Sequence, residues 1–245
     1  MDASKLTPNE RRELLVLLEE KRLRESRNRL AGYFPDDGPL RRELYPKHLE
    51  FFRAGADYRE RCAMCANRVG KTEGMGGYET ALHLTGRYPH WWEGSYYDEP
   101  VRWWAAGKTN ETTRDIIQKK LFGDVTGSGV GKHVSGTGLI PGDLIGDLTW
   151  KAGVPDLIDT AQVKHEPTGG WSVLGLKSYQ QGRGSFEGTE QDGIWLDEEP
   201  PLDVYGECLI RTATTDGLIF ITFTPLEGMS EVVLQFLPGG AVPNA

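Results

Sequence analysis

Residues 65–74, CANRVGKTEG, decide how the rest of this chain is interpreted. Gly70-Lys71-Thr72 matches the end of the pattern GxxxxGK(S/T), in which a tight turn wraps around phosphate groups. Cys65 occupies the position of the first glycine. Because the first residue shapes the turn and does not contact phosphate, we expect a cysteine to be tolerated there if it ends a strand. A helix cap with an incidental lysine is the alternative interpretation.

The sequence on both sides of this motif favours a phosphate-binding loop. Residues 60–66 form a short apolar run that stops at Asn67, and residues 73–84 have helical character. This order places the loop at a helix N-terminus, where unpaired N–H groups and the helix dipole attract anions. Lys71 is expected to reach the β and γ phosphates of a nucleotide, and the Thr72 hydroxyl to hold Mg²⁺. The predicted nucleotide-binding residues of the loop are Asn67, Arg68, Val69, Gly70, Lys71 and Thr72.

A second motif supplies the acidic groups that such a site needs. Residues 193–200, GIWLDEEP, read as a buried strand that ends in Asp197 and Glu198. Asp197 is expected to coordinate Mg²⁺, directly or through water, and Glu198 to polarise the water that attacks the γ-phosphate. Glu199 is the alternative candidate for this base. The two motifs together predict hydrolysis of ATP, with Mg²⁺ as cofactor and with Lys71 and Glu198 as catalytic residues.

The remaining segments outline an α/β fold. Apolar runs at residues 101–107 and 217–225 read as buried strands, and helical character follows the first of them. Residues 159–179 contain two extended segments around the turn Pro167-Thr168-Gly169-Gly170, which predicts a β-hairpin. The glycine-rich residues 123–156 read as a loop or an irregular insertion that buries little.

These elements predict a mainly parallel central sheet flanked by helices, because strands alternate with helices along the chain. The chain between the two motifs has room for a further strand and helix, which indicates the P-loop NTPase class with an additional strand and a catalytic glutamate. Residues 8–30 read as a charged helix that is solvated or docks on a partner. We expect residues 1–35 to be an N-terminal helical extension and residues 36–245 to form the ATPase domain, with the β-hairpin inserted.

Composition limits the partners that this chain can have. Of 245 residues, 38% are hydrophobic and 26% charged, as is ordinary for a soluble globular protein. No apolar stretch approaches the ~20 residues needed to span a bilayer, so we expect no membrane association and a cytosolic location. The formal net charge of −8 gives no general attraction to nucleic acid, so any contact with DNA must be local.

Five segments occur here in the order that one protein family shows. They are YPKHLEFF (45–52), CANRVGKTEG (65–74), ETALHLTGRYPHWW (79–92), SYQQGRGSFEGTEQDGIWLDEEP (178–200) and FITFTPLEGMSEVV (220–233). On these segments the chain resembles the N-terminal ATPase domain of the terminase large subunit of tailed bacteriophages, a DNA-packaging motor. The resemblance covers residues 40–236 and is more specific than a phosphate-binding loop alone.

This resemblance implies roles for residues outside the two motifs. Tyr45 and His48 lie in the segment that approaches adenine in that family, although related ATPases often have glutamine where this chain has His48. Thr222 and Thr224 match the coupling motif, which senses the nucleotide and communicates with the DNA-gripping surface. Threonine is also common in strands simply because it is β-branched.

The resemblance also implies two candidates for a catalytic arginine. Arg68, inside the loop, corresponds to an arginine that acts on the γ-phosphate of its own subunit. Arg183, in QGRGS, corresponds to an arginine that reaches the nucleotide of a neighbouring subunit. A planar guanidinium suits the charge that develops on the γ-phosphate. The alternative for Arg183 is an ordinary ion pair with a surface carboxylate.

At the level of function, the resemblance implies an ATPase that translocates viral double-stranded DNA into the procapsid. The implied partners are DNA, the portal protein, the small terminase subunit and further copies in a ring on the portal, with a monomer expected in isolation. The implied location is the host cytoplasm, with transient docking at the portal. We expect the C-terminal nuclease domain of the family to be absent from these 245 residues, and hence no nuclease activity. The alternatives are a nucleotide-dependent interaction module and a helicase-like DNA remodeller.

Overall fold

The computed structural model describes residues 7–27, 29–225 and 230–237. The helices are α1 (Pro8–Arg27), α2 (Pro46–Ala54), α3 (Tyr78–Thr85), α4 (Asn110–Thr112), α5 (Lys119–Phe122), α6 (Leu202–Thr212) and α7 (Glu231–Gln235). The strands are β1 (Glu60–Met64), β2 (Arg102–Gly107), β3 (Val125–Thr126), β4 (His133–Val134), β5 (Ile145–Trp150), β6 (Ile158–Lys164), β7 (Trp171–Ser178), β8 (Gly193–Asp197) and β9 (Leu218–Phe223). Two π-helical segments, η4 (Lys71–Gly77) and η5 (Thr113–Gln118), precede α3 and α5.

Seven strands form the central sheet in the order β1-β9-β8-β2-β7-β6-β5. The first five are parallel, and β6 and β5 continue the sheet as antiparallel neighbours. The prediction of a mainly parallel sheet with a β-hairpin is therefore confirmed, since β6 and β7 form the predicted hairpin. The strand between β1 and β8 is β9, which comes last in the chain, so the additional strand of the P-loop NTPase class is also present.

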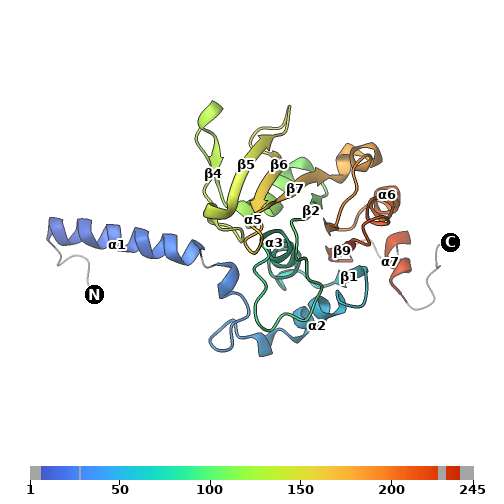
Figure 1. Cartoon of the computed structure of the whole chain (residues 1–245), viewed down its shortest axis with the longest axis horizontal. Coiled ribbons are helices and arrows are strands. Elements are labelled where there is room, and N and C mark those ends of the chain that lie inside the picture. The colour runs from blue at the N-terminus through green and yellow to red at the C-terminus, as the bar shows by residue number, and fades with distance from the viewer. Residues whose placement is uncertain (1–6, 28, 226–229, 238–245) are drawn as a thin grey trace.

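Helices cover both faces of the sheet, which explains why its central strands are apolar throughout (Figure 1). In β8, Trp195 packs into the core beneath η4 and α3, whereas Ile194 and Leu196 pack into a second core beneath α6. All five β8 residues are buried. The alternation of side chains along a strand thus sends successive apolar residues to two different cores.

The expectation that residues 123–156 form a loop that buries little is wrong in part. This segment contains the small β3–β4 hairpin and β5, the edge strand of the main sheet. Leu139 and Ile140 are fully buried. A Cβ at Gly138 would lie 2.4 Å from the Leu121 backbone, so glycine permits close packing of the chain on α5. Here glycines mark a close approach of two backbones and not a loose loop.

The predicted N-terminal helix is present as α1, and it extends away from the sheet and the other helices (Figure 1). Leu15, Leu17 and Leu18 on this helix are all more than half exposed. Directly after α1 the chain joins the main core, in which Leu30 and Phe34 are buried. Within the described helices, none is long and apolar enough to cross a membrane.

Candidate nucleotide site

The glycine-lysine-threonine loop connects β1 to η4, as its sequence predicts. The backbone N–H of Cys65 donates to the Phe223 carbonyl at 3.0 Å, which extends the pairing of β1 with β9 by one residue. Cys65 therefore ends the strand, and its side chain is compatible with this backbone. Gly70 has φ +84°, a left-handed conformation that favours glycine, and the helical segment begins at Lys71.

The structure brings the two sequence motifs together, although they are separated by about half of the chain. The Thr72 hydroxyl donates to Asp197 at 3.1 Å across a separation of 125 residues. The Lys71 ammonium lies 3.5 Å from a Glu198 carboxylate oxygen. This convergence occurs because β1 and β8 are parallel strands of one sheet, so that the segments after their carboxyl ends share one edge.

Asp197 has the environment of a carboxylate that binds a cation. Its side chain lies in the core, with the residue only 4% exposed, and burial raises its pKa to about 7; the nearby Glu198 carboxylate adds to the rise. Hydroxyl hydrogen bonds from Thr222 and Thr72 partly offset this effect. The hydroxyl and carboxylate are the hard oxygen donors that Mg²⁺ prefers. Thr72 and Asp197 thus fit a Mg²⁺ ion, whose charge would favour the ionised carboxylate.

Strand β9 and the residue that directly follows it, Thr224, supply hydroxyl groups to both motifs. Thr222 accepts a hydrogen bond from the Trp195 indole at 2.8 Å and donates to Asp197 at 2.9 Å. Thr224 accepts from the Lys71 ammonium at 2.8 Å and donates to the Asn67 side chain at 3.0 Å. The two residues predicted as a coupling motif therefore contact the lysine and the aspartate directly.

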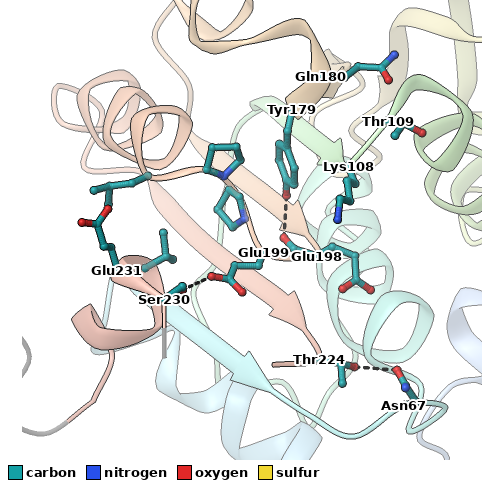
Figure 2. Close-up of a pocket in the computed structure, with 14 residues that line it drawn as sticks. Asn67, Lys108, Thr109, Tyr179, Gln180, Glu198, Glu199, Thr224, Ser230 and Glu231 are labelled. Carbon is teal, nitrogen blue, oxygen red and sulfur yellow. Dashed lines mark hydrogen bonds between the residues drawn. The ribbon is translucent and has the colours of Figure 1, made fainter. Parts of the chain in front are cut away.

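Glu198 and Glu199 follow β8 but have different surroundings (Figure 2). Glu198 lies near Lys71 with its side chain 44% exposed, whereas Glu199 accepts a hydrogen bond from Ser230 at the start of α7. Both line a cavity of about 780 Å³ that also reaches Asn67 and Thr224 of the nucleotide loop region. The access of Glu198 to this cavity and its contact with Lys71 favour it over Glu199 as the base.

A second cavity, of about 390 Å³, lies on the other side of the loop. Tyr45 and His48 line it, next to Gly70, as their predicted position near a nucleobase requires. Burial lowers the pKa of His48, and a hydrogen bond to the Val69 backbone opposes this effect. Sequence reasoning missed Tyr33 and Phe34, which line the same cavity. The only sequence signal for them is an aromatic pair after the N-terminal helix.

The two candidate arginines are not brought into contact with Lys71, Asp197 or Glu198 in the described part of the chain. Arg68 is exposed and lines the smaller cavity with φ +63°. The Arg183 side chain is 54% exposed, and its Nε donates to the buried Glu207 of α6 at 3.0 Å. Arg183 thus forms an ion pair, as in its alternative interpretation, but the carboxylate is buried and not at the surface.

Comparisons with known proteins show the family and the fold of this chain. The family described as "Terminase large subunit, T4likevirus-type, N-terminal" matches residues 62–241. The terminase large subunit of Salmonella phage P22 is 38% identical over 250 residues, which cover 95% of this chain and 47% of that protein. The chain therefore spans about half the length of this curated relative. A mutant of the ATPase domain of the Thermus phage P74-26 large terminase superposes with a TM-score of 0.54 and 18% identity, over 88% of this chain and 76% of that one, which is a likeness of fold.

Proposed function

This chain belongs to the family of terminase large subunits, and from that premise we propose that it is an ATPase motor domain that drives viral double-stranded DNA into a procapsid. The observation that carries the proposal is the convergence of two motifs. Thr72 meets Asp197 at 3.1 Å, and Lys71 meets Glu198 at 3.5 Å. A cation, a metal-binding pair and a carboxylate base at one edge of a parallel sheet are what the hydrolysis of ATP needs.

Each of these residues has a distinct task in the proposed reaction. Lys71 binds the β and γ phosphates and offsets their charge. Thr72 and Asp197 would hold Mg²⁺, which supplies positive charge against the phosphoryl oxygens. Glu198 accepts a proton from the attacking water, which it can reach from the larger cavity. Tyr45 and His48 bind the adenine of the nucleotide in the smaller cavity, which residues of the loop also line.

The proposed partners follow from the family. We propose that the chain acts on double-stranded DNA together with a portal protein and a small terminase subunit, in a ring of copies that docks at the portal in the host cytoplasm. Because the net charge is −8, contacts with DNA phosphates must come from local cationic groups. Among the described residues, no group of three or more His, Cys, Asp or Glu side chains is placed so that it could hold a metal ion.

Phosphate release from ATP tests the assignment of the base. Glu198→Gln should lower the rate by about 10²- to 10⁴-fold, because it removes general-base catalysis. Binding of a fluorescent ATP analogue should persist in this variant. Glu199→Gln is the matched control, since it removes the neighbouring carboxylate and should retain hydrolysis. Hydrolysis at the normal rate by Glu198→Gln would refute the assignment.

Two further conditions separate a motor from a nucleotide switch. Double-stranded DNA should raise the rate of phosphate release if the chain is a DNA motor. The rate per molecule should rise with protein concentration if Arg183 acts on a neighbouring subunit, whereas a flat profile favours Arg68 or the absence of a catalytic arginine. An ATPase that responds to neither DNA nor concentration would contradict the motor function while leaving hydrolysis intact.

A further inference from the structure

One buried hydroxyl group contacts the backbone of both acidic residues of the site. The Tyr179 hydroxyl lies 2.9 Å from the carbonyl oxygen of Glu198 and 3.0 Å from that of Asp197. It is also 3.4 Å from the carbonyl of Ala106, at the end of β2. Figure 2 shows the ring of Tyr179 pointing from its own turn toward Glu198. Tyr179 itself is only 6% exposed, so its hydroxyl is placed by the core around its ring.

The backbone of Glu198 adopts a conformation that needs such support. Its φ is +66°, in the left-handed region, which a residue with a Cβ rarely adopts. The N–H of Glu198 donates to the Thr222 carbonyl at 2.9 Å, and its carbonyl faces the Tyr179 hydroxyl. Both polar groups of this peptide segment are therefore fixed from neighbouring elements. Strained backbone of this kind persists where the surrounding structure holds it.

The backbone conformation of Glu198 decides where its carboxylate points. A residue that relaxed to negative φ would turn its Cα–Cβ bond, and the carboxylate would leave its position 3.5 Å from Lys71. Glu199 and the two prolines that follow it belong to no strand, so strand pairing does not restrain this part of the chain. A hydrogen bond to the backbone carbonyl of Glu198 thus also restrains the direction of the Glu198 side chain.

We propose that Tyr179 is a positioning residue. Its hydroxyl holds the Glu198 backbone in the conformation that aims the carboxylate at the reacting water. This inference rests on the proposed role of Glu198 as the base. The residue acts through Glu198 and does not touch the phosphates. Removal of the hydroxyl alone should therefore reduce kcat while leaving nucleotide binding intact.

The same tyrosine connects the base to a short helical turn that precedes Arg183 in the chain. Tyr179 begins a short helical turn, residues 179–181, that is closed by reciprocal hydrogen bonds between Ser178 and Gln181. Gln181 is held in addition by the Lys151 ammonium at 3.1 Å. The neighbouring Gln180 lines the large cavity with Glu198. A contact that shifts this turn would thus move the Tyr179 hydroxyl and, with it, the base.

Tyr179→Phe tests the proposal because it removes the hydroxyl and keeps the buried ring. We expect kcat for ATP hydrolysis to fall by about 10- to 100-fold, as for a misplaced catalytic group, with KM and the Kd of a fluorescent ATP analogue unchanged. Tyr205→Phe is the matched control: Tyr205 is equally buried and donates its hydroxyl to Glu60, away from the base. Both variants should melt at similar temperatures, but only the first should lose kcat.

A variant pair separates positioning from a general loss of structure. In a Glu198→Gln background, adding Tyr179→Phe should leave the residual rate unchanged, because a residue that acts only through the base has nothing left to position. If Tyr179→Phe does not fold, Gln181→Ala decides: it loosens the turn and should give the same selective loss of kcat.

The outcomes distinguish this inference from the proposed function. If Glu198→Gln is inactive but Tyr179→Phe has the kcat of the unmodified chain, only the positioning role is refuted. An unchanged kcat in Gln181→Ala refutes it equally when the tyrosine variant is unfolded. If Glu198→Gln retains full hydrolysis, both the assignment of Glu198 as the base and the positioning role of Tyr179 are refuted.

Discussion

Asp197→Asn should make the folded chain more stable and at the same time abolish its Mg²⁺-dependent hydrolysis. Burial raises the pKa of Asp197 to about 7, so that the ionised carboxylate is unfavourable in the folded protein. An asparagine is neutral at every pH and retains a carbonyl oxygen that can accept the hydroxyl hydrogen bonds of Thr72 and Thr222. The cost of ionisation is therefore removed together with the metal-binding charge.

The magnitude follows from the difference between the folded and unfolded pKa. In an unfolded chain an aspartate has a pKa of about 3.9, and each unit of difference corresponds to about 1.4 kcal/mol. Because the folded pKa is raised, the associated stability is fully present below pH ~3.9 and is lost as the pH rises to about 7. The loss amounts to about 1–2 kcal/mol at pH 5 and about 4 kcal/mol at pH 8. Asp197→Asn should recover these amounts.

Urea unfolding at pH 5 and pH 8 measures the effect as a difference between variant and unmodified chain. The gain in free energy of unfolding should be larger at pH 8 by about 2–3 kcal/mol. Asp37→Asn is the control, since Asp37 is an exposed aspartate remote from the two motifs in sequence and should show no such gain. A gain from Asp197→Asn that is absent, or equal at both pH values, would refute the argument that burial dominates at this carboxylate.

The other predictions concern a buried ion pair and two glycines in helical segments. Arg61→Met leaves the fully buried Glu79 without the cation that lies 2.6 Å away. In urea unfolding it should lower the free energy of unfolding by about 3–5 kcal/mol. Adding Glu79→Leu to this variant should restore most of the lost stability. Gly76→Ala places a Cβ 2.1 Å from the Trp195 indole and should cost about 1–3 kcal/mol by thermal unfolding. Gly206→Ala in α6, whose Cβ meets no atom within 4 Å, should instead stabilise the chain by about 0.5–1 kcal/mol. A destabilised Gly206→Ala or an unaffected Gly76→Ala would contradict this contrast.

The sequence predicts the central site well because parallel strands impose strong geometric rules. Residues that follow the carboxyl ends of two parallel strands must lie along one edge, so that Lys71 and Asp197 could be placed together without coordinates. The chemistry of each side chain then limits its role. The resemblance to the terminase family, and not this geometric rule, implies the place of Thr222 and Thr224 near the site, where their hydroxyls contact Asp197 and Lys71.

Other parts of the molecule depend on packing that local sequence does not encode. Glycines between residues 123 and 156 have the composition of a loop, but the close approach of Gly138 to the α5 backbone is visible only in three dimensions. The aromatic residues Tyr33 and Phe34 join the smaller cavity from a segment that precedes the phosphate loop by about thirty residues. Tyr179 lies in a quoted motif, yet its partners are backbone carbonyls, which leave no trace in the sequence.

The position of β9 between β1 and β8 has a mechanical consequence under the proposed function. Thr222 lies in β9 and Thr224 follows at its carboxyl end, and the hydroxyls of both face the loop and the acidic motif. One bonds to Asp197 and the other to Lys71, with hydrogen bonds of 2.8–2.9 Å. Phosphates that draw the lysine or the aspartate toward themselves compete with these two bonds. Under the proposed function, occupation of the site would therefore act directly on the carboxyl end of β9 and on Thr224, which lines the larger cavity.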